Sequence, residues 1–119
     1  MARILIVDDL AFIKVVEKDI LEKNGHEVAA DASNGREAVE QYSNVRPDLV
    51  LMDITMPEVN GLTALRKILD IDSEAKVIMC SALGQQDLIV EAIEMGAKDF
   101  IVKPFTADRL LSAIDKAIR

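Results

Sequence analysis

Short apolar runs rich in β-branched residues recur along the chain, separated by longer segments of helical period. The runs span residues 4–7, 49–52, 77–79 and 100–102, with a weaker run at 28–30. Their hydrophobicity is continuous rather than alternating, which is typical of strands buried on both faces, as in a parallel sheet. The pattern therefore predicts five strands at the centre of the molecule.

The segment after the first run has the period of a helix. Phe12, Val16 and Ile20 repeat at i, i+4 and i+8, and Asn24-Gly25 follows them as a helix C-cap. An Asn-Gly pair can also form a hairpin turn, but the period of the preceding segment is wrong for a strand. We predict that this helix ends near Gly25.

Four more helices are expected. Asn34, with Glu37 three residues later, resembles a capping box at the start of one. The others are predicted over 62–71, 85–95 and 108–118, the last with Thr106 as its N-cap. Strands that alternate with helices and are joined by right-handed crossovers form an α/β fold, a doubly wound five-stranded parallel sheet with helices on both faces. The 119 residues fit one domain, over 1–119.

Composition and charge narrow the range of partners. The formal net charge is −7 and there is no Trp, so we expect no direct nucleic-acid partner. Cys80 and His26 are the only residues of their types, which excludes an internal disulfide and a Cys/His zinc site. The apolar run at 4–7 is too short for a signal peptide or a membrane span, so we expect a cytoplasmic protein without a membrane partner.

Polar and charged residues directly follow the predicted strands. In parallel sheets of this kind, ligands bind just beyond the carboxyl ends of the strands. Asp8 and Asp9 follow the first strand, Asp53 the third, Ser81 the fourth and Lys103 the fifth. Each has an ordinary explanation alone, because aspartate and serine cap helices and form turns and lysine is a common surface residue. Their joint occurrence at the strand ends of a parallel sheet indicates a site.

The chemistry of this set favours a cation and a phosphoryl group. Two carboxylates about 4 Å apart repel each other by about 4 kcal/mol at an effective dielectric near 20. Oxygen ligands without His or Cys favour Mg²⁺, and the Lys103 ammonium can pair with Asp53 and neutralise a phosphoryl group. Asp53 stands alone on the central strand, which makes it the best candidate for a phosphoryl acceptor.

These residues lie in motifs that resemble a known family. The motifs are Ile-Val-Asp8-Asp9, Leu-Met-Asp53-Ile-Thr-Met-Pro57-Glu-Val-Asn-Gly61, Cys-Ser81-Ala and Lys103-Pro104-Phe. Over essentially the whole chain they resemble the receiver domain of two-component response regulators, and within that family the single-domain chemotaxis regulators of Gram-positive and thermophilic bacteria. The resemblance implies a flavodoxin-like fold with strand order 2-1-3-4-5.

The resemblance also implies roles for the acidic residues and Thr55. A histidine kinase would phosphorylate Asp53. Asp9, Asp53 and the backbone carbonyl of Thr55 would hold Mg²⁺, and Asp8 would act mainly through water. The chain itself would be no enzyme beyond this self-catalysed transfer.

The resemblance also implies a conformational change on phosphorylation. Lys103 and Ser81 would bind the phosphoryl group, and the Lys103-Pro104 peptide bond would be cis. Ser81 would then move toward the phosphoryl oxygens and vacate space for the ring of Phe100. Phe100 stands where enteric chemotaxis regulators carry Tyr, so a readout through that hydroxyl is impossible here.

We expect a partner surface on the helix at 85–95, whose apolar face is wider than a core-facing stripe needs. Together with the last strand and the last helix it would bind a downstream protein such as the flagellar motor switch. If Leu88 and Val90 were both buried, this surface would be excluded. A phosphatase is a further expected partner, and we expect a monomer.

Other functions remain as alternatives. The chain could belong to another pathway or form the receiver half of a longer DNA-binding regulator. Asp53-Ile-Thr55 also resembles the nucleophile motif of Mg²⁺-dependent phosphatases, but that chemistry needs a general acid where Thr55 stands. A flavin or nucleotide binder would need a glycine-rich loop where Asp8-Asp9 stands.

Overall fold

The computed structural model describes residues 1–56 and 59–119; Pro57 and Glu58, which belong to one of the motifs above, lie outside the described residues. Strands and helices alternate along the described chain. In order they are β1 (Arg3–Val7), α1 (Ala11–Lys23), β2 (Glu27–Ala32), α2 (Gly35–Val45), β3 (Leu49–Asp53), α3 (Gly61–Ile71), β4 (Val77–Ser81), α4 (Gln86–Met95), β5 (Asp99–Val102) and α5 (Ala107–Ile118).

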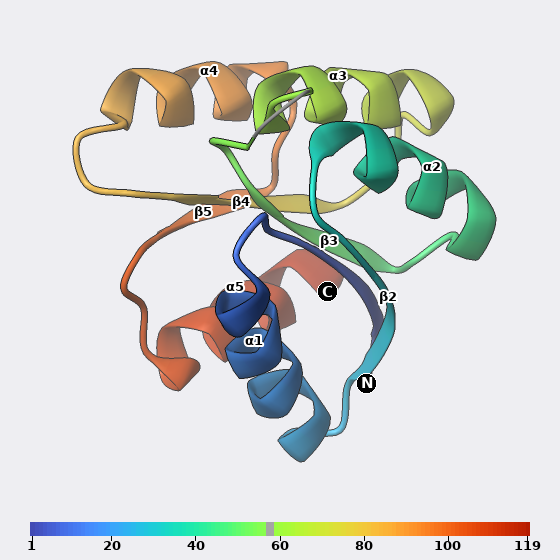
Figure 1. Cartoon of the computed structure of the whole chain (residues 1–119), viewed down its shortest axis with the longest axis vertical. Coiled ribbons are helices and arrows are strands. Elements are labelled where there is room, and N and C mark those ends of the chain that lie inside the picture. The colour runs from blue at the N-terminus through green and yellow to red at the C-terminus, as the bar shows by residue number, and fades with distance from the viewer. Residues whose placement is uncertain (57–58) are drawn as a thin grey trace.

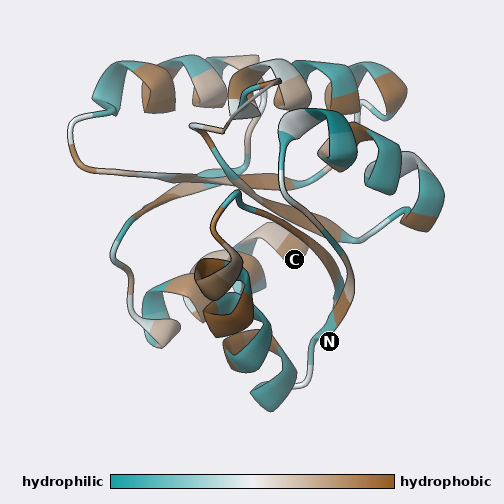
Figure 2. Cartoon of the chain, in the orientation of Figure 1, coloured by the Kyte–Doolittle hydropathy of each residue, from teal (hydrophilic) through white to brown (hydrophobic). Residues whose placement is uncertain are grey.

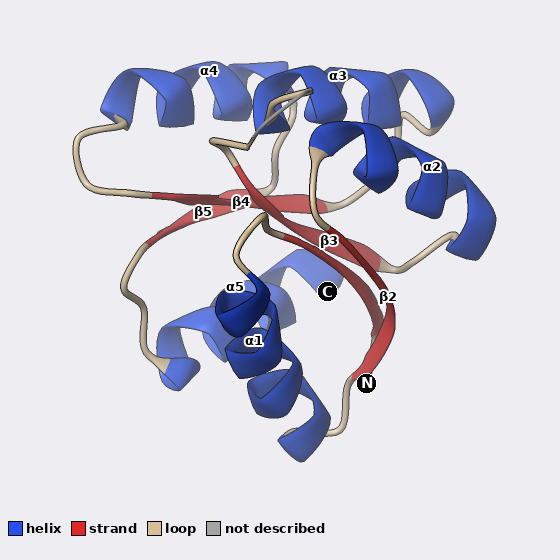
Figure 3. Ribbon diagram, in the orientation of Figure 1, coloured by secondary structure: helices blue, strands red, loops and turns tan. Residues whose placement is uncertain are grey.

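The strands form one parallel sheet in the order β2-β1-β3-β4-β5. Helices α1 and α5 cover one face, and α2, α3 and α4 cover the other (Figures 1 and 3). This arrangement confirms the predicted doubly wound fold and its strand order. It also places the carboxyl ends of β1, β3 and β4 side by side in the middle of the sheet.

The central strands β1, β3 and β4 are buried on both faces of the sheet, which explains why they are almost continuously apolar (Figure 2). Along β1, Leu5 and Val7 pack in the core beneath α2, α3 and α4, whereas Ile4 and Ile6 pack in the core on the side of α1 and α5. No helix of the described residues is long and apolar enough to cross a membrane.

Side-chain caps fix the starts of several helices. Asn34 accepts a hydrogen bond from the Glu37 amide (2.8 Å), as expected for the capping box, whereas the Glu37 side chain accepts from the Ser33 amide (2.8 Å), one residue before the cap, and not from that of Asn34. Thr106 accepts a hydrogen bond from the Arg109 amide at 3.1 Å, as predicted. Capping therefore sets where these helices begin.

Helix α3 begins at Gly61, one residue before its predicted start, because Asn60 caps it by accepting from the Thr63 amide at 3.0 Å. Gly61 also lies against the end of β3. A Cβ atom at this position would be 2.3 Å from the Asp53 carbonyl oxygen, so only glycine fits. The start of α3 is thereby packed directly onto the backbone of Asp53.

Only the last member of the apolar repeat that predicted α1, Ile20, packs partly against the core. Phe12 is 64% exposed and Val16 46% exposed, whereas Glu17 and Leu21 are buried. The helix was correctly predicted, but its buried face was not apparent. The reason is that a polar residue, Glu17, lies at the centre of that face.

Candidate functional site

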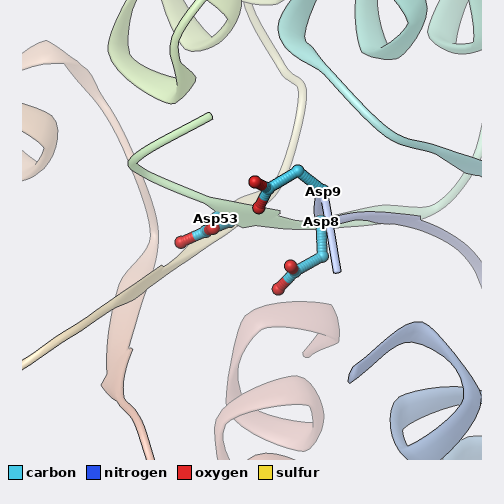
Figure 4. Close-up of side chains that lie close together, drawn as sticks. All are labelled: Asp8, Asp9 and Asp53. Carbon is cyan, nitrogen blue, oxygen red and sulfur yellow. The ribbon is translucent and has the colours of Figure 1, made fainter. Parts of the chain in front are cut away.

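Three carboxylates meet at the carboxyl ends of β1 and β3. One oxygen from each of Asp8, Asp9 and Asp53 lies within 4.8 Å of the others (Figure 4). Asp8 is 1% exposed and Asp53 8% exposed, whereas Asp9 is exposed. The parallel topology thus brings together the acidic residues that the sequence singled out.

Backbone hydrogen bonds hold two of these aspartates in place. The Asp8 amide donates to the Ala32 carbonyl at 3.1 Å, and the Asp8 side chain accepts from the Leu10 amide at 2.9 Å. Next to Asp53, the Ile54 amide donates to the Cys80 carbonyl at 2.9 Å. The site is built on the sheet itself, which favours a fixed geometry.

Lys103 reaches the carboxylates from the end of β5. Its Nζ donates to Asp8 Oδ2 at 2.5 Å and lies 3.7 Å from Asp53 Oδ1. Burial lowers the pKa of Lys103, but the hydrogen bond to Asp8 and the charges of Asp53 and Asp8 outweigh it and raise that pKa above its usual range. Lys103 is therefore a cation fixed in the site. The peptide bond between Lys103 and Pro104 is cis.

The surroundings of Asp53 disfavour the ionised form of its carboxyl group. Burial is the largest cause and raises its pKa to about 6; Lys103 opposes this effect, and the charges of Asp8 and Asp9 add to it. The single ammonium of Lys103 therefore offsets only part of the combined effect of burial and of the neighbouring carboxylates on Asp53. A further cation at this point would relieve the repulsion.

Ser81 is the last residue of β4 and lies next to this cluster in the sheet, where Asp53 pairs with Cys80. Its side chain is fully buried, and its Oγ has no hydrogen-bond partner among the described residues. Leaving a buried hydroxyl unpaired costs about 1–3 kcal/mol. Such a group is available to bond a ligand atom that enters the site.

Two polar residues beside the site were not identified from the sequence. Glu17 of α1 is 1% exposed, and its Oε1 has no hydrogen-bond partner in the described part of the chain. Burial and the charge of Asp8 raise the pKa of Glu17 to about 8, with Lys103 opposing. Gln85, before α4, bonds to Ala82 and Thr55. In the sequence, the only indication that Glu17 is buried is its position four residues before Leu21, which places both side chains on the same face of the helix.

Phe100 lies away from the carboxylates, on the side of α4. It is half-buried and lines an apolar cavity of about 460 Å³ with Ile89, Val90 and Ile93. Val90 is 57% exposed and Ile93 41% exposed, while Leu88 is partly buried. The condition that would have excluded a partner surface, burial of both Leu88 and Val90, is therefore not met.

The fold and the site define a receiver domain. The chain belongs to the response regulator receiver domain family, whose model matches residues 4–115. Chemotaxis protein CheY of Bacillus subtilis is 62% identical over 116 residues, with 98% of this chain and 97% of the relative covered. Chemotaxis protein CheY of Thermotoga maritima is 58% identical over 114 residues, with 96% and 95% covered.

A solved structure has the same fold. The matching chain in the crystal structure of the CheX–CheY–BeF₃–Mg²⁺ complex from Borrelia burgdorferi is 38% identical and superposes with a TM-score of 0.94, with 98% of this chain and 89% of that chain covered. By homology, the chain is a CheY-like chemotaxis regulator, a signalling protein.

Proposed function

We propose that the chain is a phosphorylation-activated switch of a two-component system, with Asp53 as the residue that accepts the phosphoryl group from a histidine kinase. The observation that carries this proposal is the setting of Asp53. It ends the central strand β3, lies 3.7 Å from the Lys103 ammonium and shares an oxygen cluster with Asp8 and Asp9. An aspartate so placed combines a nucleophilic oxygen with a cation that can neutralise a phosphoryl group.

Mg²⁺ fits the donor set of this site. The cluster offers only hard oxygen ligands, and its carboxylates are close enough to repel one another. Asp9, Asp53 and the backbone carbonyl of Thr55 would hold the ion, and Asp8 would act mainly through water. When bound, Mg²⁺ supplies positive charge that stabilises the phosphoryl oxygens during transfer.

The chain's own residues then account for the transfer. An oxygen of Asp53 forms a bond to phosphorus while the bond between phosphorus and the imidazole nitrogen of the donor breaks. Lys103 neutralises the added charge, and Ser81 Oγ donates a hydrogen bond to a phosphoryl oxygen. The group stays on the chain, so the protein acts as a signalling switch and not as an enzyme that turns over a separate substrate.

The output surface would be formed by α4, β5 and α5. The phosphoryl group draws Ser81 toward it, and the ring of Phe100 turns into the vacated space. The exposed Val90 and Ile93 beside the apolar cavity support a protein partner here. The 62% identity to a chemotaxis protein supports a target such as the flagellar motor switch, with a phosphatase as a further partner. We propose that the single domain over 1–119 acts in the cytoplasm as a monomer.

Incubation with acetyl phosphate, followed by intact mass measurement, tests this function. We expect a gain of one phosphoryl group that requires Mg²⁺ and is absent in Asp53→Asn. A gain of the same size in Asp53→Asn would move the acceptor to another residue. No gain in the wild type would contradict the switch.

A further inference from the structure

The side chain of Gln85 connects two segments that border the site. Its Oε1 accepts a hydrogen bond from the Ala82 amide at 2.6 Å, and its Nε2 donates one to Thr55 Oγ1 at 2.5 Å. Ala82 directly follows Ser81, and Thr55 lies two residues after Asp53. One carboxamide therefore bridges the chain after the proposed acceptor and the chain after the buried serine.

Gln85 also occupies a special position before α4. It is the N-cap residue of this helix, yet its side chain makes no capping hydrogen bond to the helix. Its backbone carbonyl accepts from the Leu88 and Ile89 amides, as the first helical bonds require. The Gln85 backbone begins α4, while its side-chain carboxamide bonds to Ala82 and Thr55. A movement of Gln85 would therefore affect both the start of α4 and these two contacts.

We propose that Gln85 is a positioning residue that stabilises the unphosphorylated arrangement of the turn at 82–85, and that a phosphoryl group on Asp53 displaces it from the Ala82 amide. This inference rests on the function proposed above. A backbone amide is a single donor, so the Ala82 N–H cannot fully serve two acceptors. A charged phosphoryl oxygen accepts more strongly than a neutral carboxamide oxygen.

Displacement of Gln85 would change the shape of the proposed partner surface. The turn at 82–85 that Gln85 holds lines one side of the apolar cavity whose other side includes Phe100. Gly84 within this turn has φ +90°, and a Cβ atom there would meet nothing within 4 Å. Residues 82–84 are exposed, and the Gln85 side chain ties this turn to the chain that follows Asp53.

The test compares Gln85→Ala with two further variants. Gln86→Ala is the matched control, because it removes an exposed glutamine one residue later. Thr55→Val removes one end of the bridge but keeps the backbone carbonyl. Calorimetry gives the affinity for Mg²⁺ alone and for beryllofluoride, a phosphoryl mimic, in saturating Mg²⁺; urea unfolding gives stability.

We expect Gln85→Ala to bind beryllofluoride roughly three- to tenfold more tightly than wild type, since one or two hydrogen bonds specific to the resting state are lost. The affinity for Mg²⁺ alone should stay within about twofold. Thr55→Val should show part of the effect, and Thr55→Val combined with Gln85→Ala no more than Gln85→Ala alone. Gln86→Ala should match the wild type.

A purely structural role for Gln85 would lower stability without changing the affinity for the mimic. Equal or weaker binding of beryllofluoride by Gln85→Ala, with normal binding by wild type, overturns this inference and leaves the proposed function intact. Absence of beryllofluoride binding by the wild type overturns the proposed function and this inference with it.

Discussion

The carboxyl group of Asp53 lies where a negative charge is poorly tolerated. Burial and the charges of Asp8 and Asp9 raise its pKa to about 6, although Lys103 opposes the shift. The ionised form of Asp53 is therefore disfavoured in this site relative to water. Binding a cation or adding a neutral group at this position should relieve this effect.

Asp53→Asn should raise the free energy of unfolding in metal-free buffer at pH 7, by about 1–3 kcal/mol, because the amide carries no charge. The same variant should bind Mg²⁺ more weakly, since a ligand oxygen is lost. Urea unfolding with and without Mg²⁺ measures both effects. A lower unfolding midpoint than wild type without metal would contradict this account of the site.

The buried Glu17 makes the free energy of unfolding depend on pH. Its pKa rises from 4.5 to about 8 on folding, so the folded state binds a proton that the unfolded state has released. The free energy of unfolding should therefore fall as pH rises from about 4.5 to 8, with a slope approaching 1.4 kcal/mol per pH unit. Glu17→Gln should flatten this slope in urea unfolding between pH 5 and 9.

Glu22→Gln is the control for this prediction, because Glu22 is exposed on the same helix. It should leave the slope unchanged. A steep slope that persists in Glu17→Gln would place the responsible group elsewhere. Asp53 contributes in the same direction between 3.8 and about 6, so both groups contribute below about pH 6 and the slope above it excludes the contribution of Asp53.

Individual elements differ in how far the sequence predicts them. The central strands β1, β3 and β4 were predictable because burial on both faces makes them almost continuously apolar, whereas the edge strand β2 is partly exposed and gave the weaker run. The site residues at their ends followed from the parallel topology. The buried face of α1 could not be predicted, because the exposed Phe12 and Val16 form a better apolar repeat than the face that holds Glu17.

Gln85 could not be predicted either, for a different reason. Its role depends on a side chain that spans from the start of α4 to Thr55, thirty residues earlier in the chain. No periodicity or local motif encodes such a contact. Caps such as Asn34 and Thr106 were predictable because they act within three residues.

At the start of α3, Gly61→Ala should destabilise the fold by about 2 kcal/mol or more, because the new methyl group would overlap the backbone of Asp53 and Ile54. Mg²⁺ affinity should fall as well, since Asp53 would shift. Thr63→Ala, on the exposed side of the same first turn, is the control. Wild-type stability in Gly61→Ala would show that this packing is not required.

In the molecule as a whole, the carboxylate site and the proposed partner surface lie apart from each other. The carboxylates lie at the ends of β1 and β3, whereas the apolar cavity lies between α4 and β5. The turn at 82–85 and Ser81 connect them. Helix α2 and strand β2 lie toward the other edge of the sheet, away from the apolar cavity (Figure 1), although the Ala32 carbonyl of β2 accepts the Asp8 amide.

Amide hydrogen exchange should change only in the segments that connect the carboxylate site to the apolar cavity. On addition of beryllofluoride and Mg²⁺, we expect exchange to change in the turn at 82–85, in α4 and in β5. Amides of α2 and β2 should exchange as before. A uniform slowing over the whole chain would indicate general stabilisation by ligand, without a localised switch.

The central claim is that Asp53 itself receives the phosphoryl group. After incubation with acetyl phosphate and Mg²⁺, borohydride reduces an aspartyl phosphate to homoserine, which peptide sequencing by mass spectrometry can locate. We predict homoserine at position 53 and at no other aspartate. Homoserine at Asp8 or Asp9, or no conversion despite Mg²⁺, would contradict the account.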